Sequence, residues 1–159
     1  WVLLLLSSVI FLGCGFYFQY IEGLAPCHLC IIQRIAFLII LIGASLSLIN
    51  PQNNILKAIA MIFWAGGTGL GIYAGTKLVY LQANPAQDMF SSCSISAEEM
   101  MNSYPILDWF PMMFEASGDC GTSSWSFYGL ATMEQITLGI FACHLLAFLF
   151  VLVANISKR

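Results

Sequence analysis

The sequence predicts an all-α membrane protein, a bundle of four transmembrane helices with a long loop between the third and the fourth helix. The chain has 159 residues, of which 60% are hydrophobic and only 8% are charged, and its mean hydropathy is +0.87. An average soluble domain carries about three times that share of charged residues. Stretches without charge also recur, and each approaches the roughly 20 apolar residues that a helix needs to cross a bilayer.

The first two predicted spans lie in the N-terminal third of the chain. Span one covers about residues 1–20, because the first charged residue is Glu22. We interpret it as a span and not as a signal peptide, since its apolar run is too long and no basic region precedes it. Because the chain starts with Trp1 instead of methionine, we expect further residues before it. Span two covers about 31–49 and contains a single charge, Arg34.

The third and fourth predicted spans complete the bundle. Span three, about 55–82, follows a short turn of Asn and Pro residues, so it should run antiparallel to span two. Its residues Gly67, Gly71 and Gly75 recur every four positions, and we interpret them as sites of close helix packing. Span four covers about 135–156, where no charged residue occurs.

Two loops should lie together on one side of the membrane. They cover about 21–30 and about 83–133, and the longer one has six acidic residues and no Lys or Arg. Basic residues favour the cytoplasmic side, and Lys57, Lys158 and Arg159 lie near the other ends of the spans. We therefore expect both termini in the cytoplasm and both loops outside.

The pair Cys27 and Cys30 stands where the short loop meets span two. Two cysteines at this spacing can close a disulfide ring or hold a metal. If a helix starts here, Cys30 lies in its first turn, where unpaired N–H groups and the helix dipole favour the reactive thiolate. Arg34, four residues later, falls on the same helix face. We expect it to have an anionic or polar partner at that depth; the alternative is that it snorkels to the headgroups.

The other four cysteines divide into two groups. Cys14 and Cys143 fall inside spans one and four, where a thiol is usually a small apolar side chain. Cys93 and Cys120 lie in the long loop, on the same side as the first pair. Four cysteines in an oxidising compartment suggest two disulfides, Cys27–Cys30 and Cys93–Cys120, unless they pair across the loops.

Three classes of function are compatible with these cysteines. Disulfide exchange between the two pairs would make an enzyme. A Cys93–Cys120 bridge that merely stabilises the outer loop would suit a membrane binding or assembly protein. A metal-binding membrane protein is the third class, but His28 should point away from both sulfurs of its helix start, and no other ligand pair has zinc-finger spacing. We therefore expect no metal site. His144, deep in span four, is expected to hydrogen-bond to a neighbouring helix.

A set of short motifs carries a family resemblance over most of the chain. They are Pro26-Cys27-His28-Leu29-Cys30 with Arg34, then Cys93, Ala116-Ser117-Gly118-Asp119-Cys120, Trp125, Phe127, Gly129-Leu130 and Gly139-Ile140-Phe141. Together these motifs resemble the DsbB family, the four-helix membrane proteins that re-oxidise the periplasmic thiol oxidase DsbA. The combination is specific, whereas a lone CxxC is not.

The resemblance implies a protein-disulfide:quinone oxidoreductase in a bacterial inner membrane, with its active cysteines in the periplasm. In such a protein Cys93 would form a mixed disulfide with the DsbA-like partner, and Cys120 would then attack Cys27. Cys30 would be left as the thiolate that faces the quinone. The implied partners are a DsbA-like oxidase and membrane lipid, and we expect no nucleic acid.

The resemblance also implies a quinone site, for ubiquinone or menaquinone. Arg34 would bind the quinone and stabilise negative charge on it. Gln82, near the outer end of span three, would lie beside it. Its amide can donate a hydrogen bond to the quinone but cannot supply a proton.

Overall fold

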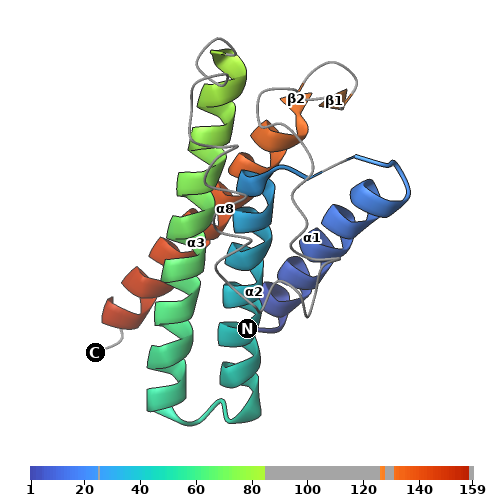
Figure 1. Cartoon of the computed structure of the whole chain (residues 1–159). Helices are drawn as coiled ribbons and strands as arrows, with labels where there is room; N and C mark the ends of the chain where they lie inside the picture. Colours follow the sequence, from blue (N-terminus) through green and yellow to red (C-terminus); the bar gives the residue numbers. More distant parts are fainter. Residues whose placement is uncertain (25, 85–125, 128–130, 158–159) are drawn as a thin grey trace, which may run out of the picture.

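The computed structural model describes residues 1–24, 26–84, 126–127 and 131–157 (Figure 1). Its elements in chain order are α1 (Val2–Tyr20), α2 (His28–Ile49), α3 (Asn54–Ala83), β1 (Ser126–Phe127), β2 (Ala131–Thr132) and α8 (Met133–Ser157). All four helices are long and apolar enough to span a membrane, and each covers one predicted span. The predicted all-helical fold is therefore confirmed. The two strands form a short antiparallel hairpin directly before α8.

One end of the bundle gathers all the chain segments that surround the CxxC pair. The end of α1, the start of α2, the end of α3 and the start of α8 lie at this end, together with the hairpin (Figure 1). We call it the cysteine end. The turn between α2 and α3 lies at the opposite end, and both termini point toward that end (Figure 1).

The pair α2 and α3 has the most extensive helix contact of the described chain. The turn between them is built by side chains that replace missing helix hydrogen bonds. The Asn50 side-chain oxygen accepts a hydrogen bond from the Gln52 N–H at 3.2 Å, and the Asn53 side-chain oxygen caps α3 by accepting from the Ile55 N–H at 2.9 Å. The predicted short antiparallel connection is confirmed.

Glycines on α3 allow both of its neighbours to approach closely. A Cβ atom added to Gly67 would lie 2.7 Å from the Ala36 carbonyl oxygen of α2. A Cβ atom on Gly71 would overlap the ring of Phe141 from α8, and one on Gly75 would lie 3.1 Å from Leu138 of the same helix. Their predicted packing role is confirmed, with Gly67 serving α2 and the other two serving α8.

Helix α8 runs antiparallel to α3 and completes the core with aromatic side chains. Phe141 is fully buried, faces Gly71 and stacks on Phe37 of α2 with ring centroids 4.4 Å apart. Two turns further from the cysteine end, Phe148 meets the edge of Trp64 at 5.4 Å. These contacts set the register of the two helices.

Helix α1 is the least embedded of the four, and it packs chiefly on α2. Phe11 stacks on Phe37 at 5.5 Å near the middle of the bundle. From there α1 diverges from α2 toward the cysteine end (Figure 1). At Gly23 the backbone has a left-handed φ of 68°, and the following Leu24 N–H bonds back to the Phe18 carbonyl at 3.1 Å. The chain can thus turn back toward α2.

The expectation for His144 is not met. Its side chain is buried and its ring packs edge-on against Phe37 at 6.1 Å, but Nδ1 has no hydrogen-bond partner among the described residues. Packing of large rings at the α2–α8 contact therefore determines where this histidine lies.

Candidate functional site

The two sulfurs of the CxxC pair are held together by the start of α2. Cys27 is the N-cap residue, and its sulfur accepts a hydrogen bond from the Cys30 backbone N–H at 3.4 Å. The two sulfur atoms are 3.0 Å apart. Cys30 therefore lies in the first helical turn as predicted, where the helix dipole favours negative charge on sulfur. Because the two sulfurs are already this close, a disulfide bond between them can form or break with little movement of either atom.

The pair is enclosed on the side of α3. Cys27 is only 3% exposed and forms an apolar cluster with Ala74, Leu78 and Leu81, while Cys30 is half-buried and packs against the same cluster. An apolar wall excludes water from one side of the sulfurs.

Arg34 lies one turn deeper and is buried, with 8% of its surface exposed. One of its terminal nitrogens donates to the side-chain oxygen of Gln19 at 2.6 Å, and the other donates to the Gly15 carbonyl oxygen at 3.2 Å. The guanidinium also lies over the Phe16 ring at 5.2 Å from its centroid. The side chain thus reaches across to α1, and the alternative of snorkelling is wrong.

Arg34 is also electrostatically coupled to the cysteine pair. Its positive charge lies one helical turn from Cys30 and therefore favours the thiolate form of that residue. In the described part of the chain, its hydrogen-bond partners are the neutral oxygens of Gln19 and Gly15, which do not cancel its charge. The guanidinium can therefore stabilise a thiolate on Cys30 or negative charge on a bound molecule.

Gln82 links the end of α3 to the start of α8. Its side-chain oxygen lies 3.5 Å from the hydroxyl of Thr132, which donates to it. The Thr132 backbone N–H in turn donates to the side chain of Gln135 at 3.2 Å, the reciprocal half of a helix capping box. Gln82 therefore sits at the cysteine end as expected, but on the side of α8, whereas Arg34 faces α1.

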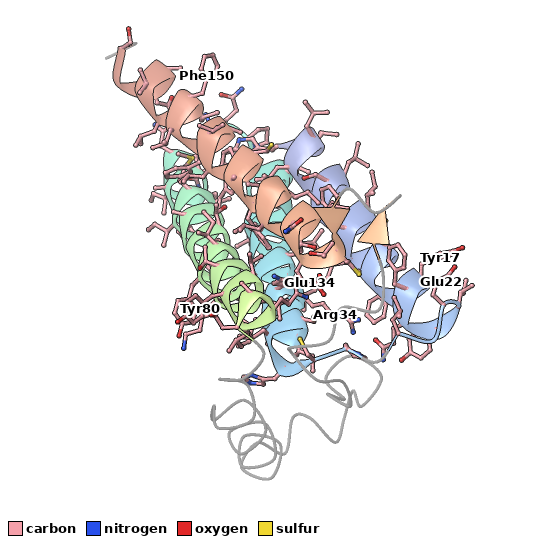
Figure 2. The ribbon with its side chains drawn as sticks, turned by 90° about the horizontal axis from the view of Figure 1, so that it is seen from above. Tyr17, Glu22, Arg34, Tyr80, Glu134 and Phe150 are labelled. Carbon is pink, nitrogen blue, oxygen red and sulfur yellow. The ribbon has the colours of Figure 1, made fainter. Side chains whose placement is uncertain are left out.

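Four polar side chains at the cysteine end have buried atoms without a hydrogen-bond partner among the described residues. These atoms are Nε2 of His28, Nε2 of Gln33, Nε2 of Gln82 and Oε2 of Glu134, and they come from α2, α3 and α8. Figure 2 shows Arg34 and Glu134 at the same end of the bundle, far from Phe150. Buried polar groups are usually paired, so unpaired ones mark a place where a polar molecule or water binds.

The other four cysteines are not part of the site that the structure describes. Cys93 and Cys120 lie outside the described residues. Cys14 and Cys143 are exposed on the sides of α1 and α8, away from the pair at the helix start. Within the described residues, no three His, Cys, Asp or Glu side chains come close enough together to hold a metal ion.

Two residues of the site were not identified from the sequence. Gln19 is the only side chain of span one with an amide or carboxyl oxygen, and a buried arginine needs such an acceptor. A lone amide acceptor in span one and an arginine in span two were therefore a signal in the sequence that the two side chains pair. Glu134 stands at the edge of span four, where a charge normally marks the membrane boundary, so its half-buried position could only come from the packing of α8 on α3.

Comparisons with known proteins identify the family of this chain over nearly its whole length. The family described as "DsbB: Disulfide bond formation protein DsbB" matches residues 1–151. The "Disulfide bond formation protein B" of Vibrio cholerae serotype O1 is 36% identical over 158 residues, which cover 99% of this chain and 89% of the relative. That of Aliivibrio fischeri is also 36% identical, covering 100% and 92%. That of Shewanella loihica is 34% identical, covering 92% and 84%. The chain therefore belongs to the DsbB family of disulfide bond formation proteins.

Proposed function

We propose that this chain re-oxidises a DsbA-like periplasmic dithiol oxidase through Cys93/Cys120 and Cys27/Cys30 and passes the electrons to a membrane quinone. DsbB proteins re-oxidise DsbA and deliver its electrons to quinone, and this chain is an oxidoreductase of that family. The observation that carries the proposal is the position of the Cys27 and Cys30 sulfurs, 3.0 Å apart at a membrane helix start and one turn from a buried arginine.

Exchange would proceed as a series of attacks by thiolates on disulfides. A thiolate of the client attacks the Cys93–Cys120 disulfide and forms a mixed disulfide with Cys93, which releases Cys120 as a thiolate. The second client thiolate resolves the mixed disulfide, so the client loses two electrons and two protons. Cys120 attacks Cys27, and the Cys27–Cys30 bond breaks with its electron pair on Cys30. The Cys93 thiolate then attacks Cys120, which restores the Cys93–Cys120 disulfide and releases Cys27, so that the client's two electrons reside on the Cys27/Cys30 pair. Arg34 and the helix dipole stabilise the negative charge that Cys30 then carries.

The residues at the cysteine end fit a quinone head group. A quinone has two carbonyl oxygens that accept hydrogen bonds, and the buried amide nitrogens of Gln33 and Gln82 each have a hydrogen-bond donor without an acceptor among the described residues. Arg34 uses two of its five N–H groups in its bonds to α1, which leaves donors for a ligand. When bound, the quinone supplies the two-electron acceptor chemistry. Arg34, Gln33 and Gln82 would hold and orient it.

The proposed orientation follows from the charges at the two ends. Lys57 lies in the first turn of α3, at the end opposite the cysteines. In the sequence, Lys158 and Arg159 come directly after Ser157, the last residue of α8. Positive residues favour the cytoplasm, so the cysteine end would face the periplasm. A membrane-impermeant thiol reagent added to intact spheroplasts should label Cys27 or Cys30 after reduction.

Quinone reduction by the purified chain tests the proposal. A reduced DsbA-like donor and a short-chain ubiquinone are mixed with the wild type, Cys30→Ser, Cys93→Ser and Arg34→Ala. Both cysteine variants should abolish turnover, and Arg34→Ala should mainly raise the quinone concentration needed for half-maximal rate. Cys14→Ser is the matched control, because its thiol is exposed on α1, and it should retain full activity.

Two results would contradict the proposal. If Cys30→Ser reduced quinone at the normal rate, the Cys93–Cys120 disulfide would serve only to stabilise the outer loop. If Cys93→Ser turned over normally, the exchange series through the long loop would be wrong.

A further inference from the structure

A carboxyl group on α8 lies at the depth of the CxxC pair. A Cβ atom on Gly75 would lie 3.1 Å from Leu138, so these two residues face each other across the α3–α8 contact. Glu134 lies one helical turn before Leu138 on the same face of α8, and Leu78 lies one turn after Gly75 on α3. The antiparallel register therefore brings Glu134 level with Leu78.

Leu78 connects this register to the sulfurs. It is 1% exposed and belongs to the apolar cluster that contains Cys27 and against which Cys30 packs. The cysteine pair and Glu134 therefore lie at the same level along the described end of α3. The pair is on the side of α2, and Glu134 is on the side of α8. Both Glu134 and Arg34 appear at this end in Figure 2.

A second observation marks the same place as a polar site. Gln33 is only 6% exposed, yet its Nε2 atom has no hydrogen-bond partner among the described residues. That atom would lie 3.4 Å from a Cβ atom on Gly75, so the amide of α2 reaches the contact between α3 and α8. Gln33 and Glu134 thus project into the same three-helix junction, one turn apart, and both carry a buried unpaired atom.

The reaction needs a proton carrier at this place. Reduction of a quinone to a quinol consumes two protons, which are matched by the two protons that the client thiols release. Arginine stays protonated in proteins, and amide groups do not release protons, so Arg34, Gln33 and Gln82 can bind but cannot deliver them. His28 also has a buried Nε2 without a partner among the described residues, but it is two residues before Cys30, about 200° around the helix, and so lies on a different face of α2.

We propose that Glu134 relays protons from water at the cysteine end to the quinone during its reduction, with Oε2 as the atom that carries each proton. This inference rests on the proposed function. Quinol formation takes up two protons and the two electrons of the Cys27/Cys30 pair, so the Glu134 side chain would accept a proton from water and pass it on twice in each turnover. The amide of Gln33 lies within the same junction and would donate a hydrogen bond to an oxygen of the bound molecule.

The other titratable groups near this level belong to neighbouring elements. Helix α2 contributes His28, Cys27 and Cys30, and the described end of α3 contributes Lys77 and Tyr80, both on its exposed face. The hairpin residue Thr132 carries no charge. Glu134 is thus the only carboxyl group in the described part of this junction, and its role can be tested by a single isosteric substitution.

The experiment compares Glu134→Gln with wild type and with Glu22→Gln, in which an exposed carboxyl of the α1–α2 loop is removed. Quinone reduction should slow by about 100-fold in Glu134→Gln, the usual contribution of a positioned acid, and remain normal in Glu22→Gln. Single-turnover oxidation of the client without quinone should be unchanged in both variants. Small carboxylic acids such as formate should accelerate Glu134→Ala but not the wild type.

Infrared spectroscopy supplies a readout that does not depend on turnover. The difference spectrum between quinone-bound and quinone-free protein should contain a band of the Glu134 carboxyl group that is absent in Glu134→Gln and present in Glu22→Gln. A Glu134→Gln protein that reduces quinone at the wild-type rate would overturn the inference. The inference would also fail if Glu134→Gln reduced quinone slowly but kept the band, and formate did not accelerate Glu134→Ala. Glu134 would then only stabilise the helix start. If the wild type itself reduced no quinone, the proposed function would fail first.

Discussion

Arg34 of α2 donates a 2.6 Å hydrogen bond to the side chain of Gln19 on α1, across the region where the two helices diverge. The same guanidinium bonds to the Gly15 carbonyl oxygen, so two acceptors one turn apart on α1 hold it in a fixed orientation. This bond attaches the least embedded helix to the bundle at the cysteine end, and it also orients the charge nearest to Cys30.

Removal of the Gln19 acceptor should destabilise the protein and disturb the site. In Gln19→Ala the buried guanidinium loses a charged hydrogen bond, which costs about 1.5–3 kcal/mol. The loss should appear as a lower midpoint in thermal or denaturant unfolding in detergent. Gln19→Glu should retain the midpoint, because a carboxylate can accept the same bond. Gln52→Ala, in the exposed turn between α2 and α3, serves as the control and should change stability by less than about 0.5 kcal/mol.

Arg34→Lys should separate charge from geometry. Lysine keeps the positive charge, but its single ammonium nitrogen cannot reproduce the two nitrogens that donate separately to Gln19 and Gly15. The quinone concentration for half-maximal rate should rise about tenfold, the effect of one lost charged hydrogen bond, with a smaller change in the exchange between client and protein. Steady-state kinetics with quinone and client varied separately would measure both. Equal quinone dependence in Arg34→Lys and the wild type would show that charge alone is sufficient.

Substitutions at Cys27 should distinguish its role as a helix cap from its chemistry. Serine can accept the hydrogen bond from the Cys30 N–H, whereas alanine cannot, so Cys27→Ala should be about 1 kcal/mol less stable than Cys27→Ser. Both variants should still form the mixed disulfide between Cys93 and the client, but neither should turn over with quinone, because the attack of Cys120 on Cys27 is lost. Unfolding midpoints under reducing conditions, with a gel assay for the mixed disulfide, would test this. Equal stability of the two variants would mean that the cap contributes nothing.

Two glycines of α3 should respond to alanine in opposite directions. In Gly71→Ala the new methyl group overlaps the Phe141 ring and should cost about 1–3 kcal/mol. Gly66 has no atom within 4 Å of an added Cβ, so Gly66→Ala should be neutral or slightly stabilising through helix propensity. Phe141→Leu added to Gly71→Ala should recover part of the loss. A Gly71→Ala protein as stable as Gly66→Ala would contradict the close packing of α3 on α8.

Most of the fold could be predicted from the sequence because a bilayer imposes strong constraints on helix length and charge. The runs without charge, the Asn50 to Asn53 turn and the spacing of Gly67, Gly71 and Gly75 each depend on local sequence, and the structure has each feature at the expected place. The helix start at Cys27 was likewise readable from the position of the CxxC pair at the end of a loop.

The candidate site was less predictable, since it depends on which helix faces are in contact. Arg34 was recognised as a buried charge, but its partner Gln19 is 15 residues earlier in the chain and on another helix. Only the packing of α1 against α2 brings the two side chains together. His144 was assigned a polar partner, whereas aromatic packing against Phe37 positions it. The position of Glu134 likewise follows from the α3–α8 register, which cannot be derived from either helix alone.

The cap at the start of α2 also has a spectroscopic consequence. The Cys27 sulfur accepts the hydrogen bond of the Cys30 amide, and its strength as an acceptor grows with its negative charge, which would change with oxidation state in the proposed function. The amide proton of Cys30 is therefore an intrinsic reporter of electron transfer, and its NMR chemical shift should follow the redox cycle without any added label.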